Sequence, residues 1–302
     1  MRICSLVPSA TETLYALGLG DSVLGITHDC DFPPEVTKKP VLIKPRIDPH
    51  APQAEIDRQV RELVSRGESI YGVDADLLQS IAPDLIVTQD LCQVCAASPD
   101  DLATALIRFP NPPQVLALTP TSLADVWGDI RRIGEATGCC DVAKKLALEL
   151  EQRVAGIAAT TARANSRPRV LCLEWLDPFY VGGHWVPEMV ALAGGVDVFG
   201  RAGEASFRVT SEEIAACGAE VIIVMLCGYN LARTIEELRR YPIPAAWNGL
   251  PAVRDHRIFA SDANSHFSRP GPRLAEGVEV LAHLLHPELF PEAPVTDAVA
   301  CI

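Results

Sequence analysis

The fold is decided by Arg2-Ile-Cys-Ser-Leu-Val-Pro-Ser-Ala-Thr-Glu12, a stretch near the start of the chain. Its first half, Arg2–Val7, is an apolar run that predicts a short buried strand. Its second half has the spacing of a capping box. In that motif the Ser9 hydroxyl accepts from the Glu12 backbone, and the Glu12 carboxylate accepts from the Ser9 backbone. A buried strand that runs directly into a capped helix is the first unit of an α/β sheet.

The same order of strand and helix recurs along the chain. Further strands are predicted at Val23–Thr27, Asp84–Thr88, Gln114–Leu118, Arg167–Leu173, Glu220–Leu226 and Arg257–Ser261. Helices are predicted at Ala54–Ser65, Asp74–Ile81, Asp100–Arg108, Val186–Ala193, Thr234–Arg240 and Arg273–Leu285, with a second capping box at Thr210-Ser-Glu-Glu213. This alternation favours parallel sheets. The segment 35–54, rich in Pro and Lys, is expected to be irregular.

Residues 122–164 differ from the rest because they contain no proline and carry apolar residues at three- and four-residue spacing. The spacing predicts about 40 residues of helix with a break at Gly138. A helix of that length can link two α/β halves as a rigid spine. We therefore expect an α/β fold with two Rossmann-like lobes, residues 1–120 and 166–302, joined by a helical spine over 121–165.

The charge of the chain excludes some partners. Its 302 residues carry a formal net charge of −13, which repels nucleic acids and anionic membrane surfaces. No apolar run reaches the length of about 18 residues that a membrane span needs. The apolar run after Met1 is too short for a secretory leader, which predicts a cytoplasmic protein as the sequence stands. If a signal peptide has been removed, the protein is instead periplasmic or extracytoplasmic. We expect the protein to be a monomer.

Ligands bind open parallel sheets beyond the carboxyl ends of the strands. In the first half this rule selects His28, Cys30, Gln89, Cys92 and Cys95. In the second half it selects Glu174, Trp175, Phe179, Tyr180, His184, Trp185, Cys227, His266 and Arg269. If the two lobes face each other, these side chains line one cleft that is rich in Cys and His.

The thiols and imidazoles of this set suit a soft transition metal such as Zn or Fe, or Cu(I). The predicted metal ligands are Cys30, Cys92, Cys95 and Cys227 with His28 or His184. The spacing Cys92-x-x-Cys95 is that of a metal half-site or a redox dithiol. The alternative is that these thiols, among ten cysteines in the chain, are small buried apolar groups.

Two other chemistries remain open at the same strand ends. Phe179, Tyr180 and Trp185 are able to stack on a flat ligand, and the Arg269 guanidinium suits a carboxylate or phosphate. A cytoplasmic enzyme is a further alternative, with a Cys nucleophile beside a His and with Glu174 or Asp177 as acid or base. No glycine-rich phosphate loop and no G-x-S-x-G motif names such a reaction.

Several segments together resemble the vitamin B12-binding component of ABC importers. They are Ser5-Leu-Val-Pro-Ser-Ala-Thr-Glu12, Val23-Leu-Gly-Ile-Thr27, Asp31-Phe-Pro-Pro34, Pro83-Asp-Leu-Ile-Val87, Leu192-Ala-Gly-Gly195 and Val209-Thr-Ser-Glu-Glu-Ile214. The resemblance covers nearly the whole chain. It implies the class III periplasmic-binding-protein fold, with two rigid lobes and a helical backbone. It also implies an acidic contact with the permease on each lobe, at Asp76 and Glu212.

The chain also differs from this family at several positions. The positions that match the corrin-stacking aromatics lie near Asp29, Tyr71 and Ser206, and only the region of Phe179 keeps an aromatic there. A longer insert spans about 35–68. The Cys and His motifs are additional to the transporter pattern. The sequence thus predicts a binding protein for cobalamin, another corrinoid or a related metal chelate. The alternatives are a transition-metal binding protein and the enzyme described above.

Overall fold

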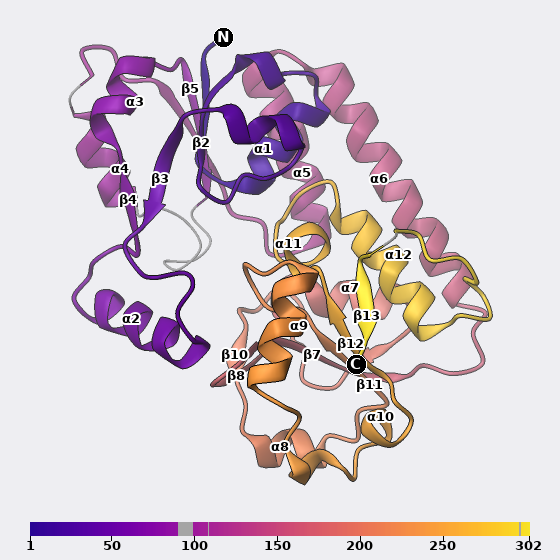
Figure 1. Cartoon of the computed structure of the whole chain (residues 1–302). Helices are drawn as coiled ribbons and strands as arrows, with labels where there is room; N and C mark the ends of the chain where they lie inside the picture. The colour runs from indigo at the N-terminus through magenta and orange to yellow at the C-terminus, as the bar shows by residue number, and fades with distance from the viewer. Residues whose placement is uncertain (90–98, 108, 296) are drawn as a thin grey trace. The chain divides into compact units, whose positions relative to one another are not determined.

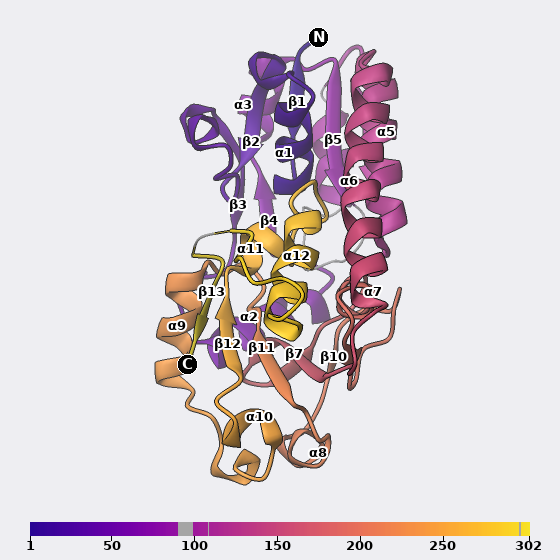
Figure 2. The ribbon, with the colours of Figure 1, turned by 90° about the vertical axis from the view of Figure 1, so that its right-hand side faces the viewer.

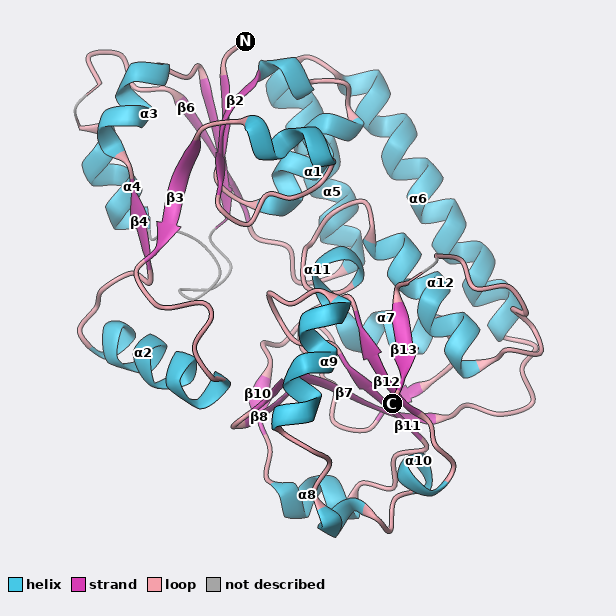
Figure 3. Cartoon of the chain, viewed as in Figure 1, coloured by secondary structure: helices cyan, strands magenta, loops and turns pink. Residues whose placement is uncertain are grey.

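The computed structural model describes residues 1–89, 99–107, 109–295 and 297–302. The chain forms two compact units, and each is built on one mixed, largely parallel sheet flanked by helices (Figures 1 and 3). Unit 1 comprises residues 1–120 and 125–148, and unit 2 comprises 121–124 and 149–302. None of the helices in the described part of the chain is long and apolar enough to span a membrane.

Unit 1 contains a six-stranded sheet with the order β4-β3-β2-β1-β5-β6. Its strands are β1 (Ile3–Ser5), β2 (Val23–Thr27), β3 (Val41–Pro45), β4 (Tyr71–Val73), β5 (Leu85–Gln89) and β6 (Gln114–Leu118). Its helices are α1 (Pro8–Ala16), α2 (Gln53–Ser65), α3 (Ala75–Ile81) and α4 (Pro99–Leu106), with most of α5 (Leu123–Thr137). All strand pairs are parallel except β3 with β4, so the ends of β1, β2, β3 and β5 meet at one edge.

Unit 2 contains a seven-stranded sheet with the order β10-β8-β7-β11-β12-β13, and β9 pairs with β7. Its strands are β7 (Arg169–Leu176), β8 (Phe179–Val181), β9 (Val196–Asp197), β10 (Phe207–Arg208), β11 (Val221–Val224), β12 (Ile258–Ser261) and β13 (Val299–Cys301). Its helices include α7 (Val186–Leu192), α8 (Ser211–Ala216), α9 (Leu231–Arg240), α10 (Pro251–Arg254), α11 (Ala263–His266) and α12 (Leu274–Leu285). The central strands β7, β11 and β12 are parallel.

The core of each unit lies against its central strands. Every residue of β11 is fully buried, and so are Leu85, Ile86 and Val87 in β5. Strands buried on both faces consist of continuous apolar residues rather than alternating ones. This is why the sequence alone identifies these strands. The polar groups of their backbones are satisfied by neighbouring strands, such as β5 paired with β1 and β6.

The predicted helical segment is confirmed, including its break. Helices α5 and α6 (Cys140–Thr161) are separated at Gly138, whose φ of 76° ends a helix without the strain a side chain would add. The two helices lie side by side in both views (Figures 1 and 2). A Cβ at Gly134 would come within 2.3 Å of the Ala143 Cβ, so glycine permits this close approach.

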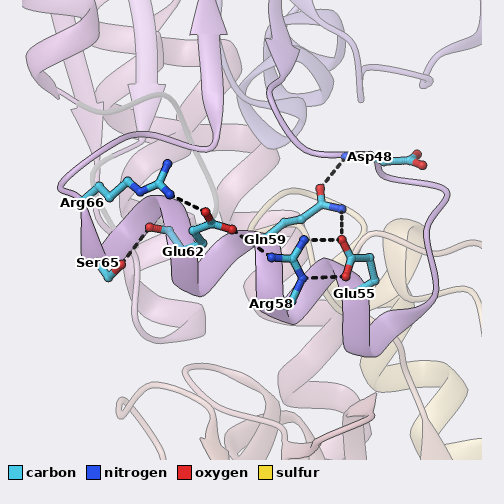
Figure 4. Close-up of polar contacts among 7 residues, drawn as sticks. All are labelled: Asp48, Glu55, Arg58, Gln59, Glu62, Ser65 and Arg66. Atoms are coloured by element: carbon cyan, nitrogen blue, oxygen red, sulfur yellow. Dashed lines mark hydrogen bonds and ion pairs between the residues drawn. The ribbon is translucent and has the colours of Figure 1, made fainter.

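Helix α2 presents a charged face held by pairs at three- and four-residue spacing (Figure 4). Arg58 donates to Glu55 at 2.7 Å and to Glu62 at 2.9 Å, and Arg66 also pairs with Glu62. The Gln59 side chain accepts from the Asp48 backbone at 3.0 Å, which ties the helix to the preceding loop. Spacings of this kind support a helix whose apolar residues are only partly buried.

The predicted capping box at Ser9 is wrong. Helix α1 begins at Pro8, its N-cap is Val7, and no side chain caps it. Proline favours the first helical position because it has no N–H to leave unpaired there, so Ser9 falls inside the first turn. There the Ser9 carbonyl accepts from the Thr13 hydroxyl at 2.9 Å.

The second predicted capping box is confirmed. The Thr210 hydroxyl accepts from the Glu213 backbone N–H at 3.2 Å, and the Glu213 carboxylate accepts from the Thr210 N–H at 2.7 Å. The segment 35–54, by contrast, is not irregular throughout, because it contains β3. Strands β4, β8, β9, β10 and β13 were also not predicted. They are short, and all but β9 pair antiparallel with a neighbour.

The contribution of the Thr210 cap to stability is testable by substitution. Replacing Thr210 with Ala removes one partner of the cap and is expected to lower the free energy of unfolding by about 1 kcal/mol. Thr210→Ser keeps the hydroxyl and should retain most of that stability. Urea unfolding followed by circular dichroism measures both variants. If the Ala and Ser variants lose the same free energy of unfolding, the hydroxyl of the cap contributes little to stability.

Candidate functional site

The loop after β2 places three of the predicted ligand-binding residues at the carboxyl edge of the sheet in unit 1. His28, Asp29 and Cys30 follow Thr27, the last residue of β2. The side chain of His28 is 23% exposed and that of Asp29 is 52% exposed. Tyr71 begins β4, opposite the end of β3, and its ring centre lies 5.6 Å from that of His28. The fold therefore brings Tyr71 next to His28, although the two residues are far apart in the sequence.

The orientation of the His28 ring is fixed by a backbone contact. Its Nδ1 lies 3.2 Å from the carbonyl oxygen of Ile43, and a carbonyl only accepts hydrogen bonds. Nδ1 therefore carries a proton. Nε2 lies 3.3 Å from an Asp29 carboxylate oxygen. A backbone carbonyl on one ring nitrogen is also the arrangement that orients metal-binding histidines, whose other nitrogen is the ligand.

Cys30 lies deeper than its neighbours and is only 4% exposed. Its sulfur is 3.1 Å from the Thr11 hydroxyl, and that hydroxyl donates to Ser5 at 2.8 Å. Thr27 accepts from the same thiol at 3.8 Å. Cys30 thus belongs to a buried polar cluster beneath the loop. Gln89, the last residue of β5, is also buried.

The predicted metal centre is not assembled by the residues that the structure describes, since no three His, Cys, Asp or Glu side chains among them lie close enough to hold an ion. Cys227 is exposed. Cys92 and Cys95 lie outside the described residues.

In unit 2 the carboxyl edge of the sheet is rich in aromatic side chains. The Trp175 and Tyr229 rings have centres 5.6 Å apart, and the Phe179 ring lies 5.1 Å from that of the fully buried Trp247. Trp175, Phe179 and Tyr180 themselves are only partly buried. This edge therefore offers apolar flat surface, as expected for Phe179 and Tyr180.

The chain reverses after β7. Strand β8 runs antiparallel to β7, and Gly182 donates to the Cys172 carbonyl at 3.0 Å. Glu174 lies within β7, one residue past Leu173, which pairs with the last residue of β11, and its carbonyl accepts from the Cys227 N–H at 3.1 Å. The predicted end of this strand at Leu173 is therefore too early, because β7 continues to Leu176 and a hairpin follows.

Two carboxyls bind the backbone of the connections after β8 and after β9. The Glu174 Oε1 accepts from the Gly183 N–H at 3.3 Å. A Cβ at Gly183 would lie 2.2 Å from the Ser206 nitrogen, so only glycine fits there. Asp197 in β9 accepts from the N–H groups of Phe199 at 3.0 Å and Gly200 at 2.7 Å.

Burial raises the pKa of Glu174 to about 7, and the charge of Asp197 adds to the increase. Burial likewise raises the pKa of Asp197 to about 6, although the backbone hydrogen bonds oppose the change. Both groups therefore bind protons more tightly in the folded chain than in the unfolded one. Burial lowers the pKa of His184 in the same region.

Three further predicted residues are buried in the segment around α11. Trp185 is 5% exposed, and its indole N–H donates to the Phe267 carbonyl at 2.7 Å. His266 is 4% exposed, with its Nδ1 3.7 Å from a Glu276 oxygen, and burial lowers its pKa to about 4. Arg269 is 8% exposed. Trp185 and His266 thus hold the segment after β12 in place.

The two predicted permease contacts occupy equivalent positions in the two units. Asp76 is the second residue of α3, whose N-cap is Asp74, and Glu212 is the second residue of α8, whose N-cap is Thr210. Both side chains are exposed. Each helix directly precedes a central strand, β5 in unit 1 and β11 in unit 2.

Sequence reasoning missed three residues that shape these regions, namely Asp197, Tyr229 and Arg233. Asp197 lies on a two-residue strand that carries no periodicity of its own. Tyr229 and Arg233 come just after the predicted strand that ends at Leu226, so their position could have been found by extending the strand-end rule by a few residues.

Glu174 gives a test of these buried carboxyls. Its folded pKa lies above the unfolded value, so its burial costs stability as pH rises from about 4.5 to 7, and the full cost remains above pH 7. Glu174→Gln removes the charge but keeps the shape. The variant should be more stable than the wild type at pH 8 by about 2 kcal/mol and equally stable near pH 5. Thermal unfolding across pH measures this, with Glu220→Gln as an exposed control. Parallel pH profiles would contradict the assignment.

The chain matches known proteins over nearly its full length. Residues 3–264 match the family model described as periplasmic binding protein. An uncharacterized ABC transporter substrate-binding lipoprotein of Bacillus subtilis is 27% identical over 96% of this chain and 82% of its own. The solved periplasmic vitamin B12 binding protein BtuF of Vibrio cholerae superposes with a TM-score of 0.69 at 22% identity, covering 94% and 96% of the two chains.

A second solved structure, the periplasmic heme-binding protein RhuT from Roseiflexus sp. RS-1 in apo form, also superposes with a TM-score of 0.69. Its identity is 24%, with 97% of this chain and 99% of the other covered. At these identities both structures show a shared fold, the class III type with two α/β lobes expected from the sequence. The match of the family model extends over most of the chain. The protein belongs to the periplasmic binding protein family.

Proposed function

We propose that this chain is the substrate-binding protein of an ABC importer and that its ligand is a planar metal chelate, a corrinoid or a haem. The family, the relative named as a transporter lipoprotein and the two fold relatives that bind vitamin B12 and heme support this class. The composition of the strand ends supports it too. Unit 2 offers flat apolar side chains, and unit 1 offers an oriented imidazole.

The observation that carries the proposal is the contact between His28 Nδ1 and the Ile43 carbonyl. It fixes the ring and leaves Nε2 as the nitrogen that would bind a metal, on a side chain that solvent reaches, and the metal would replace the contact of Nε2 with Asp29. Both cobalt in a corrinoid and iron in a haem accept an imidazole nitrogen as axial ligand. Asp29 beside Nε2 and the ring of Tyr71 then border the metal-binding nitrogen.

The other predicted residues take different roles in this proposal. Gln89 in unit 1, and Trp175, Phe179 and Tyr180 in unit 2, are proposed to contact the ligand. Trp185, His266 and Arg269 are proposed to support the fold of unit 2, because they are buried. Glu174 and His184 are proposed to position the segment after β8, through the contacts of Gly183 with Glu174 and of His184 with Glu204. Cys30 and Cys227 are proposed to be neither metal ligands nor nucleophiles.

His28 is tested by spectroscopy. Titration of the protein with hydroxocobalamin and, separately, with haemin should shift the visible spectrum of at least one of them as the axial ligand exchanges. His28→Ala should abolish that shift and weaken binding by about tenfold or more. His50→Ala, an exposed histidine in the same unit, serves as the control and should bind as the wild type does. A full spectral shift in His28→Ala would contradict an axial role.

The permease contact is proposed for Asp76 and Glu212 together. Both carboxylates are exposed at capped helix starts, where short helices hold them in fixed positions. Exposed charges of this kind guide association with a cationic partner more than they add to fold stability. Each unit supplies one such group.

The double variant Asp76→Asn with Glu212→Gln tests this contact. It should lower the affinity for the reconstituted permease by roughly tenfold while leaving ligand binding unchanged. Binding to permease in detergent or nanodiscs, measured at low and high salt, gives the readout. Glu68→Gln, another exposed carboxylate of unit 1, is the matched control. Unchanged affinity in the double variant would exclude these two groups as the contact.

A further inference from the structure

A fixed guanidinium lies at the carboxyl edge of the sheet in unit 2. The Arg233 Cζ is 3.7 Å from the centre of the Tyr229 ring, which places the cation on the face of the ring. Tyr229 is only 3% exposed, and its other neighbours include the Trp175 ring, 5.6 Å away. The guanidinium is therefore stacked on an aromatic side chain that cannot move away. Arg233 itself is only partly buried.

The backbone around this stack is tied to two strand ends. Tyr229 lies five residues beyond Val224, the end of β11, and its carbonyl accepts from the Asn264 N–H at 3.2 Å. The Asn264 side chain also donates to the Gly228 carbonyl at 3.3 Å. Asn264 follows β12, so the loops after β11 and β12 are joined. The position of Arg233 is thus set by the sheet and not by a free loop.

Charges of both signs surround this guanidinium. Arg233 lies in the first turn of α9, a helix of ten residues whose N-cap, Asn230, accepts from the Arg233 N–H at 3.0 Å. The start of a helix carries partial positive charge. The carboxylates of Glu236 and Glu237 in the same helix contact Arg240 at 2.6 and 3.0 Å. Burial raises the pKa of Tyr229, and the charge of Glu237 adds to the increase, so this carboxylate also acts on the ring under Arg233. A planar guanidinium held flat is suited to two-point binding of an oxyanion.

We propose that Arg233 is a specificity-determining residue that binds an oxyanion on the rim of the chelate, either a carboxylate or a phosphodiester. The inference rests on the proposed function, since it assumes a planar metal chelate as ligand. Haem carries two propionate carboxylates, and cobalamin carries one phosphodiester in its nucleotide loop. Haem dimethyl ester and cobinamide are the corresponding chelates without these anions. Arg233 favours the anionic chelate over the neutral one in each pair, while the aromatic side chains contact the macrocycle that both members of a pair share.

The test is a comparison of four chelates on four proteins. Haemin, its dimethyl ester, cyanocobalamin and dicyanocobinamide are titrated into the wild type, Arg233→Met, Arg233→Lys and Arg201→Met, with affinity measured by fluorescence quenching. Arg201 is the matched control. It also lies over an aromatic ring, 4.5 Å from the centre of Phe207, but in the loop before β10. Thermal unfolding of each variant confirms that it is folded.

The wild type should bind the anionic member of at least one pair about tenfold more tightly than the neutral member, as expected for one charged hydrogen-bonded contact. Arg233→Met should remove that preference by weakening only the anionic chelate. Arg233→Lys should keep part of the preference, and Arg201→Met should keep all of it. A preference within the haem pair identifies the carboxylate as the bound group, and one within the corrinoid pair identifies the phosphodiester.

Two outcomes would overturn the inference. Equal affinity of the wild type for both members of each pair would show that no oxyanion is recognised. Equal weakening of both members by Arg233→Met would show that Arg233 only packs on Tyr229. In both of these cases a chelate still binds, so the proposed function stands. Absence of binding by all four chelates would remove the proposed function and this inference together.

Discussion

The arrangement of this protein depends on pairs of parallel strands that are buried on both faces. Strands β5 in unit 1 and β11 in unit 2 have no exposed apolar side chains, and their backbone groups are satisfied only by their neighbours in the sheet. Parallel strands must be joined by crossover connections, so their carboxyl ends all lie at one edge of the sheet. Polar residues excluded from the core collect in the loops at that edge. The ligand-facing chemistry of each unit follows from this constraint.

The two edges differ in the kind of chemistry that they offer. The loop after β2 supplies an imidazole whose orientation is fixed by the Ile43 carbonyl. The edge of unit 2 supplies aromatic rings and a stacked guanidinium, Arg233. Each of these contacts, taken by itself, suits one part of the proposed ligand class: an imidazole suits its metal, an aromatic ring its flat face and a guanidinium its acidic rim.

The buried carboxyls of Glu174 and Asp197 show a different use of charge. Glu174 binds a backbone N–H between β8 and α7, and Asp197 binds backbone N–H groups between β9 and β10, yet burial disfavours the charged forms of both. These connections are thus held by groups whose pKa values lie near neutrality, which links their stability to pH. Such a link is a property of unit 2 alone and needs no ligand.

The sequence by itself determined the alternation of buried strands and helices, the helical segment with its break at Gly138, and the capping box at Thr210. Each depends on neighbouring residues, through apolar runs, helical spacing or a local hydrogen bond. Only the tertiary structure decided that Pro8 displaces Ser9 as a helix start, that β7 continues past Glu174 into a hairpin with β8, and that Tyr71 meets His28. Short antiparallel strands such as β4 and β8 have too few residues to show a pattern, and their partners are chosen by packing across the sheet. The sequence therefore identified the residue types of the candidate site, and the fold selected which of them come together.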